Sequence, residues 1–183
     1  MLIGAAALTT GCESGQSWFP GLGADERRPP DESRLNSIPH QRAVVEVDRV
    51  LDAWHDAAAH GDFDAYFACM TEDAVFLGTD PDERWVGRGF REFARPYFNG
   101  VEAWTYHPFE RRIMIEPSLE HRVAWFDEKL ENATYGECRG TGVVVREPDG
   151  HWRIAHYSLT FPVPNDIAKD VTERIRAAER GGS

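Results

Sequence analysis

Residues 122–161 read RVAWFDEKLENATYGECRGTGVVVREPDGHWRIAHYSLTF, and this stretch decides the fold. It contains three runs rich in β-branched and aromatic residues, at about 122–131, 135–146 and 151–161, and a similar run precedes them at about 102–116. Short turn sequences separate the runs, and Pro148-Asp149-Gly150 is a strong hairpin signal. Consecutive strands with short turns predict an antiparallel meander.

Amphipathic helices precede this predicted sheet. Apolar residues recur at spacings of three and four from Val44 to Ala58, which places them on one face of a helix that ends at Gly61. Asp62 is positioned to cap a short second helix. A third helix is predicted over residues 89–98, with its apolar side chains on one side.

The remaining elements are short. Residues 71–73 predict a turn, and two strands are expected at about 74–78 and 85–87. A final amphipathic helix is predicted to begin near Asn165. Helices first and a long antiparallel sheet second indicate the α+β class.

Composition excludes several classes of function. The chain has 183 residues, with 20 Lys and Arg against 31 Asp and Glu, and its formal charge of −11 argues against a nucleic-acid surface. The three cysteines form no metal-like cluster, and no metal-ligand motif or phosphate loop is present, so no metal or cofactor is expected. Six Trp, ten Phe and five Tyr suggest a well-filled core or an aromatic-lined cavity.

The first twelve residues form a short apolar run with small residues before Cys12, which is typical of the end of an export signal. The stretch Leu8-Thr9-Thr10-Gly11-Cys12 resembles the lipobox of bacterial lipoproteins, although Thr9 stands where Leu is usual and no basic residue precedes the cysteine. The resemblance implies that Cys12 receives a lipid, and that the exported protein is anchored to the bacterial cell envelope.

The chain divides into four segments by composition. The signal segment 1–12 is followed by residues 13–39, which are rich in Gly, Pro and charge and predict a disordered tether. The folded domain is expected over 40–166, and a C-terminal helix and tail over 167–183.

The order of elements and a set of residue strings resemble one fold family. The strings run from Trp54 through the helix corner Gly61-Asp62-Phe63-Asp64 to the closing Pro162-Val163-Pro164. The others are Phe67, Thr71–Phe76, Trp85–Gly87, Ala124–Asp127, Arg139–Val143 and Gly150–His156. Together they resemble the SnoaL-like branch of the nuclear transport factor 2-like superfamily over about residues 41–166. The resemblance implies a cone of three N-terminal helices packed on a strongly bent antiparallel sheet, with a ligand cavity on the concave side.

Strand alternation selects candidate site residues. In the run 151–161, Trp152 and Ile154 are expected to face the helices, which would place His156 and Ser158 toward the same interior. In the run 122–130 each face carries one carboxylate, and by the resemblance we place Asp127 in the cavity. Asp127 and His156 would then be a catalytic acid–base pair. The alternative is structural, with Asp127 paired to Arg139 on the next strand and His156 bonded to a backbone carbonyl.

Aromatic residues are the other candidates for ligand contacts. The predicted ligand-binding set is Trp54, Tyr66, Phe76, Trp85, Phe93, Trp125, Arg139 and Ser158. At helical and strand spacing the same rings also suit a filled core. Cys69 and Cys138 are either a disulfide or two separate buried thiols.

Three functions remain open from the sequence. The first is an envelope-anchored domain that binds a small apolar or amphipathic ligand in its cone. The second is an enzyme in which Asp127 and His156 catalyse isomerisation, cyclisation or hydrolysis. The third is a protein-interaction domain without a small ligand. By the resemblance a homodimer is expected through the open sheet face, with Tyr157, Leu159 and Phe161 covering it.

Overall fold

A computed structural model describes residues 37–100, 103–117 and 121–181. The helix α2 (Ile38–Ala59) begins where the side chain of Ser37 accepts a hydrogen bond from the backbone N–H of His40. Pro39, expected to end the tether, lies instead in the first turn of α2, where its missing N–H costs no hydrogen bond. The signal segment, Cys12 and most of the tether lie outside the described residues, so the lipid anchor stays a prediction.

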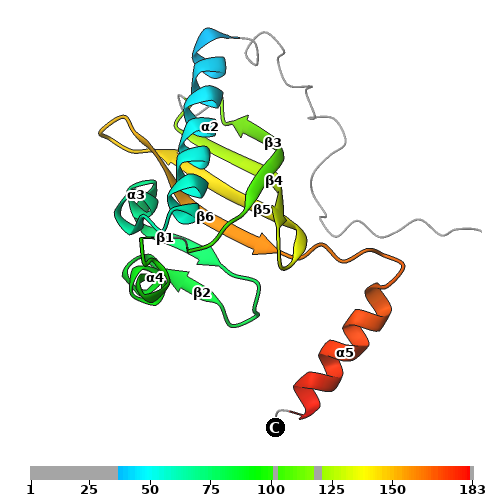
Figure 1. The fold of residues 1–183 in the computed structure, drawn as a ribbon. Coiled ribbons are helices and arrows are strands. Elements are labelled where there is room, and N and C mark those ends of the chain that lie inside the picture. The colour runs from blue at the N-terminus through cyan, green and yellow to red at the C-terminus, as the bar shows by residue number, and fades with distance from the viewer. Residues whose placement is uncertain (1–36, 101–102, 118–120, 182–183) are drawn as a thin grey trace, which may run out of the picture. The chain divides into compact units, whose positions relative to one another are not determined.

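Within the described ranges six strands form one sheet in the order β2-β1-β6-β5-β4-β3 (Figure 1). The strands are β1 (Met70–Leu77), β2 (Arg84–Val86), β3 (His107–Ile115), β4 (Val123–Asn132), β5 (Gly136–Arg146) and β6 (Trp152–Thr160). The predicted meander β3–β6 is confirmed as antiparallel. The sheet as a whole is mixed, because β1 pairs in parallel with β6.

The shorter elements follow the prediction with small shifts. Asp62 caps α3 (Phe63–Ala68), and its side chain accepts from the backbone N–H of Ala65. The predicted turn at 71–73 is instead the first part of β1, where the pairing with β6 is irregular. The third helix is α4 (Gly87–Ala94) followed by the 3-10 turn η1 (Arg95–Tyr97).

The C-terminal helix α5 (Ala168–Gly181) begins three residues later than predicted and has no buried residue. In the part of the chain that the structure describes, no helix is long and apolar enough to cross a membrane.

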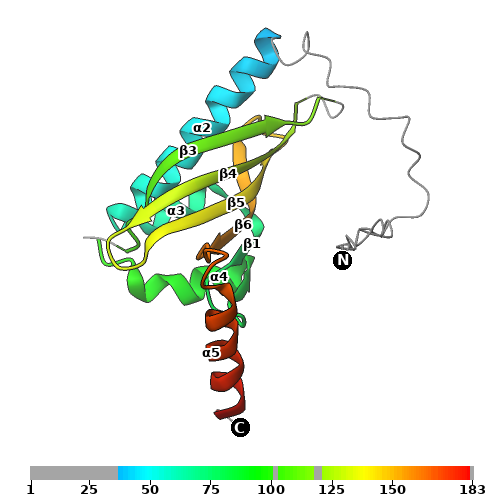
Figure 2. The same ribbon diagram turned by 90° about the vertical axis from the view of Figure 1, so that its right-hand side faces the viewer.

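The helix α2 lies along one face of the sheet, as Figures 1 and 2 show from two directions. Its predicted apolar stripe is confirmed, because Val47, Leu51 and Trp54 are buried in the core. The sheet contributes Phe126 and Ile154 to the same core. The helices α3 and α4 pack against β1. The three helices therefore cover the face of the sheet that was predicted to be concave.

A β-bulge changes the side-chain alternation of β6. Val143 pairs with His156 and Val144 with Ile154, which leaves Ala155 as the extra residue. The inward set therefore changes from Trp152 and Ile154 to Tyr157 and Leu159. The expectation that His156 and Ser158 point inward is wrong, because a bulge reverses every later position of the strand.

Gly142 makes room for this bulge. It lies opposite Tyr157, beside the shift in register. A Cβ atom at this position would lie 2.4 Å from the backbone oxygen of His156 and 2.7 Å from Cε1 of Phe126. Any side chain at residue 142 would therefore clash with backbone that the bulge has moved.

The open face of the sheet also differs from the prediction. Tyr157 and Leu159 were expected to cover a dimer interface there, but both are buried in the core. Phe161 remains 41 % exposed and packs on Tyr135, with ring centroids 5.0 Å apart. A homodimer stays a prediction, but two of the three residues expected at its interface are not available on the surface.

Candidate functional site

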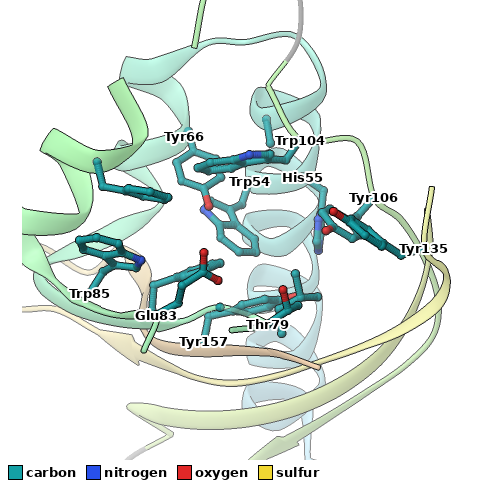
Figure 3. Close-up of a pocket in the computed structure, with 15 residues that line it drawn as sticks. Trp54, His55, Tyr66, Thr79, Glu83, Trp85, Trp104, Tyr106, Tyr135 and Tyr157 are labelled. Carbon is teal, nitrogen blue, oxygen red and sulfur yellow. The ribbon is translucent and has the colours of Figure 1, made fainter. Parts of the chain in front are cut away.

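A cavity of about 220 Å³ lies between the helices and one end of the sheet (Figure 3). Of its fifteen lining residues nine are aromatic, one is a carboxylate and none is Lys or Arg. They are Trp54, His55, Ala58, Tyr66, Phe76, Gly78, Thr79, Glu83, Trp85, Phe93, Trp104, Tyr106, Tyr135, Tyr157 and Leu159. Cavities that hold drug-sized ligands measure about 300–1,000 Å³, so a ligand of this cavity would be small.

The aromatic walls hold one another in place. Trp54 of α2 stacks on Tyr66 of α3, with ring centroids 5.0 Å apart. Trp85 of β2 stacks on Phe93 of α4 at 4.2 Å. Each contact joins two elements, so the cavity shape is fixed by the same packing that fixes the helices.

Behind one wall of the cavity lies a buried carboxylate, Glu128 of β4, whose side chain is 0 % exposed. Its Oε1 accepts hydrogen bonds from His55 Nε2 at 2.8 Å and from the Tyr157 hydroxyl at 3.2 Å. Its Oε2 accepts from Arg111 Nε at 2.7 Å. Because an ionised carboxylate only accepts, the proton between His55 and Glu128 belongs to Nε2 of the imidazole.

Arg111 extends this cluster to the surface of α2. Its Nη1 contacts carboxylate oxygens of Asp48 and Asp52, each at 2.7 Å. The cluster thus connects α2, β3, β4 and β6 through charged hydrogen bonds. Removing one partner of such a buried pair costs about 3–5 kcal/mol, because the other charge stays buried without compensation.

The charges keep Glu128 ionised. Burial alone would raise the pKa of Glu128, but the hydrogen bond and charge of His55, together with those of Arg111, lower it below its ordinary value. For Arg111, burial acts to lower the pKa, and the charge of Glu128 with the hydrogen bonds to three carboxylates raises it well above its ordinary value.

Gly140 of β5 provides the space for this cluster. A Cβ atom there would lie 2.2 Å from the Tyr157 hydroxyl oxygen and 3.0 Å from Oε1 of Glu128. A residue with a side chain at position 140 would therefore push Tyr157 away from the carboxylate.

Two residues of the cluster also line the cavity. His55 and Tyr157 contact Glu128 on one side and the cavity on the other. An imidazole oriented by a buried carboxylate is an arrangement suited to general acid–base chemistry. Within the described residues no group of three or more His, Cys, Asp or Glu is arranged to hold a metal ion.

Three tyrosines of the cavity, Tyr66, Tyr106 and Tyr157, are protonated at neutral pH. Burial raises the pKa of Tyr66 and of Tyr157 well above the ordinary value, and it raises the pKa of Tyr106 to about 12. Their hydroxyl groups can therefore donate hydrogen bonds, and the rings carry no phenolate charge.

Five of the predicted ligand-binding residues line the cavity, namely Trp54, Tyr66, Phe76, Trp85 and Phe93. The other three lie on the outward face of the sheet. Trp125 is 42 % exposed, Arg139 is exposed and Ser158 is half-buried. The outward position of Trp125 and Arg139 follows from the alternation of β4 and β5, and that of Ser158 from the bulge in β6. Binding of a ligand by any of them stays a prediction.

The predicted catalytic pair does not face the cavity. Asp127 and His156 both lie on the outward face, on β4 and β6, with β5 between them. Two strand spacings correspond to about 10 Å, which is beyond hydrogen-bond reach. The carboxylate of Asp127 lies 3.7 Å from Nη1 of Arg112 on β3. Across the strands Arg139 lies opposite Lys129 and not Asp127, and among the described residues no ion pair joins Asp127 to Arg139, contrary to the structural alternative.

The inward carboxylate is Glu128, because the inward set of β4 is Ala124, Phe126, Glu128 and Leu130. A sequence signal for this existed, since three of these four residues are apolar while the other set carries two charges. Other cavity residues have no comparable signal in the sequence. Four of them lie in loops or turns or just outside a strand, namely Glu83, Trp104, Tyr106 and Tyr135, and the fifth is His55 of α2.

The two cysteines are not joined. Both Cys69 and Cys138 are free thiols, and burial raises the pKa of each thiol. The choice left open by the sequence is settled in favour of separate thiols.

The lowered pKa of Glu128 predicts acid sensitivity. Its stabilising effect should be complete above the ordinary Glu pKa of about 4.3 and should be lost as the pH falls through the lower folded value. We expect the difference in unfolding free energy between the wild type and Glu128→Gln, measured by urea denaturation from pH 6 downward, to shrink below about pH 4.3. The exposed Glu131→Gln on the same strand should show no such change. A difference that grows as the pH falls would contradict the lowered pKa.

Comparisons with known proteins agree with this architecture. The fold is similar to that of an NTF2-like protein of unknown function from Pseudomonas putida KT2440, with 14 % identity, a TM-score of 0.56, and 68 % of this chain and 90 % of that chain covered. A proposed dehydratase of the NTF2-like family from Streptomyces avermitilis has 13 % identity, a TM-score of 0.57 and coverage of 68 % and 99 %. A proposed scytalone dehydratase from Novosphingobium aromaticivorans DSM 12444 has 12 % identity, a TM-score of 0.54 and coverage of 68 % and 87 %.

At these identities the structural matches establish the fold alone, which is the α+β cone of the NTF2-like type. A search of curated proteins finds no match. The model of the SnoaL-like domain matches residues 47–164, which is more than half of the chain. The protein therefore belongs to the SnoaL-like domain family.

Proposed function

We propose that the protein binds a small, mainly apolar ligand in the cavity of its cone. The observation that carries this proposal is a cavity of about 220 Å³ lined by nine aromatic residues from several helices, strands and loops. A core that only stabilised the fold would fill this space, because empty volume costs contact energy. Two stacked pairs within the lining, Trp54 with Tyr66 and Trp85 with Phe93, hold the walls of this space in place, which favours a ligand between them.

The proposal predicts binding of a small neutral probe, 3-tert-butylphenol, measured by isothermal titration calorimetry. Trp85→Ala removes a cavity wall and should weaken the affinity about five- to tenfold. Trp125→Ala is the matched control, because this residue lies on the outward face, and it should leave the affinity unchanged. Equal affinities of the wild type and Trp85→Ala, or equal losses in both variants, would contradict binding in this cavity.

Acid–base catalysis is the second candidate function. It is favoured by the 2.8 Å hydrogen bond between Glu128 and the cavity-lining His55. The carboxylate accepts the proton of Nε2, so Nδ1 is the ring nitrogen left to exchange a proton with a bound molecule. Catalysis and simple binding differ in whether the bound molecule is converted to a product or recovered unchanged. A compound that is consumed by the wild type, but that His55→Gln binds equally well and returns intact, would establish catalysis. Unaltered consumption by His55→Gln would exclude His55 from it.

We also propose that the protein is exported and lipid-anchored through Cys12. The support is the string Leu8–Cys12 and the Gly- and Pro-rich segment that follows it. Expression of the full chain in a bacterium fed an alkyne fatty acid should label the protein, and Cys12→Ser should remove the label. Cys69→Ser is the control and should keep it. A wild type without label, or a labelled Cys12→Ser variant, would contradict the anchor.

A further inference from the structure

We infer that the ligand of the cavity is a small organic cation, an amine or quaternary ammonium with an apolar body. This inference rests on the proposed ligand binding and adds the charge of the ligand. Three features of the cavity carry it: the ring faces, the position of Glu83 and the lack of cationic side chains on the walls that the structure describes.

The ring faces favour a cation. The face of an aromatic ring carries partial negative charge, and a cation over several such faces gains more than it would over one. Trp54, Trp85, Trp104 and Tyr157 line the same space from α2, β2, the segment before β3 and β6 (Figure 3). Trp is the ring with the strongest attraction for a cation, and three of these four are Trp.

The carboxylate of Glu83 supplies a full negative charge at this space. Figure 3 shows it directed into the region between Trp85, Trp54 and Tyr157. Its Oε2 accepts a hydrogen bond from the backbone N–H of Asp80 at 3.2 Å, which holds the side chain against its own loop. The loop is closed by the backbone bonds from Gly78 N–H to Glu83 O at 2.9 Å and from Glu83 N–H to Asp80 O at 3.1 Å.

Gly78 is the residue that allows this conformation. A Cβ atom at position 78 would lie 2.1 Å from Oε2 of Glu83 and 2.9 Å from its Cβ and Cδ. The absence of a side chain at residue 78 thus lets the carboxylate reach the cavity wall. Because Glu83 is half-buried there, its charge acts at shorter range and with less screening than a solvated carboxylate would.

No basic side chain neutralises Glu83 from the described walls. The lining contains no Lys or Arg, and the imidazole of His55 is bonded to Glu128, whose charge Arg111 also shares. On the same loop Asp80 and Asp82 are exposed carboxylates, which make the approach to the cavity more negative. An anionic ligand would be repelled by these groups, whereas a cation would be attracted.

A buried donor indicates a second property of the ligand. Trp54 is 3 % exposed, and its indole Nε1 has no hydrogen-bond partner in the structure as described. A buried N–H without a partner is unfavourable, and an oxygen acceptor on a bound molecule would satisfy it. A hydroxyl or carbonyl oxygen on the cation would supply that acceptor.

Three probes of the same shape and different charge test the inference on the full chain by isothermal titration calorimetry. They are (3-hydroxyphenyl)trimethylammonium, the neutral 3-tert-butylphenol and the anionic 3-hydroxybenzenesulfonate. We expect the cation to bind about tenfold more tightly than the neutral probe, as several cation–π contacts and one carboxylate would provide. The sulfonate should bind most weakly.

Substitution of Glu83 tests whether this carboxylate is the group that gives the cavity its preference for a cationic ligand. Glu83→Gln keeps the shape of the side chain and should reduce the ratio of the cation's affinity to that of the neutral probe from about ten to about one. Asp82→Asn is the matched control and should keep most of the preference for the cation. A thermal unfolding midpoint close to that of the wild type would show that the variant is folded.

The outcomes separate the two proposals. If the neutral probe binds as tightly as the cation, or if the sulfonate binds more tightly, the inference about charge is wrong and ligand binding stands. If the preference for the cation survives in Glu83→Gln, the assignment to Glu83 is wrong. If none of the three probes binds, both the proposed function and this inference are wrong.

Discussion

The buried charge of Glu128 is the constraint on which the rest of the domain depends. A carboxylate without solvent must be fully compensated, and here the compensation comes from His55 on α2, Arg111 on β3 and Tyr157 on β6. These three bonds fix the position of α2 against the sheet and the register of β6 at its bulge. They also require a glycine at position 140, because any side chain there would displace the Tyr157 hydroxyl.

The cavity follows from this arrangement. The buried cluster holds α2 across β3, β4 and β6. The elements at one end, including the β1–β2 loop and the segment before β3, surround a space that their rings leave open. His55 and Tyr157 belong to both the cluster and the cavity wall, so the group that stabilises the fold also shapes the site. A change in Glu128 would alter stability and ligand binding together, whereas a change in Glu83 would act on the ligand alone.

Sequence patterns predicted the elements far better than the site. The stripe from Val47 to Ala58 and the meander β3–β6 obey simple periodicities, and both are confirmed. The parallel pairing of β1 with β6 has no local signal, since it joins segments about eighty residues apart. The inward positions of β6 depend on one extra residue, Ala155, and strict alternation therefore assigned His156 to the wrong face. Five cavity aromatics were identified because they belong to regular elements, whereas Trp104, Tyr106 and Tyr135 lie where no periodicity applies.

The most direct measurement is a crystal structure of the protein soaked with (3-hydroxyphenyl)trimethylammonium. The account predicts density for the probe among the rings of Trp54, Trp85 and Tyr157, with the trimethylammonium group beside the Glu83 carboxylate. It also predicts the probe's oxygen within hydrogen-bond distance of Trp54 Nε1. An occupied cavity in which the hydroxyl group, and not the ammonium, lies against Glu83 would contradict the charge assignment. A cavity closed by its own side chains would contradict ligand binding itself.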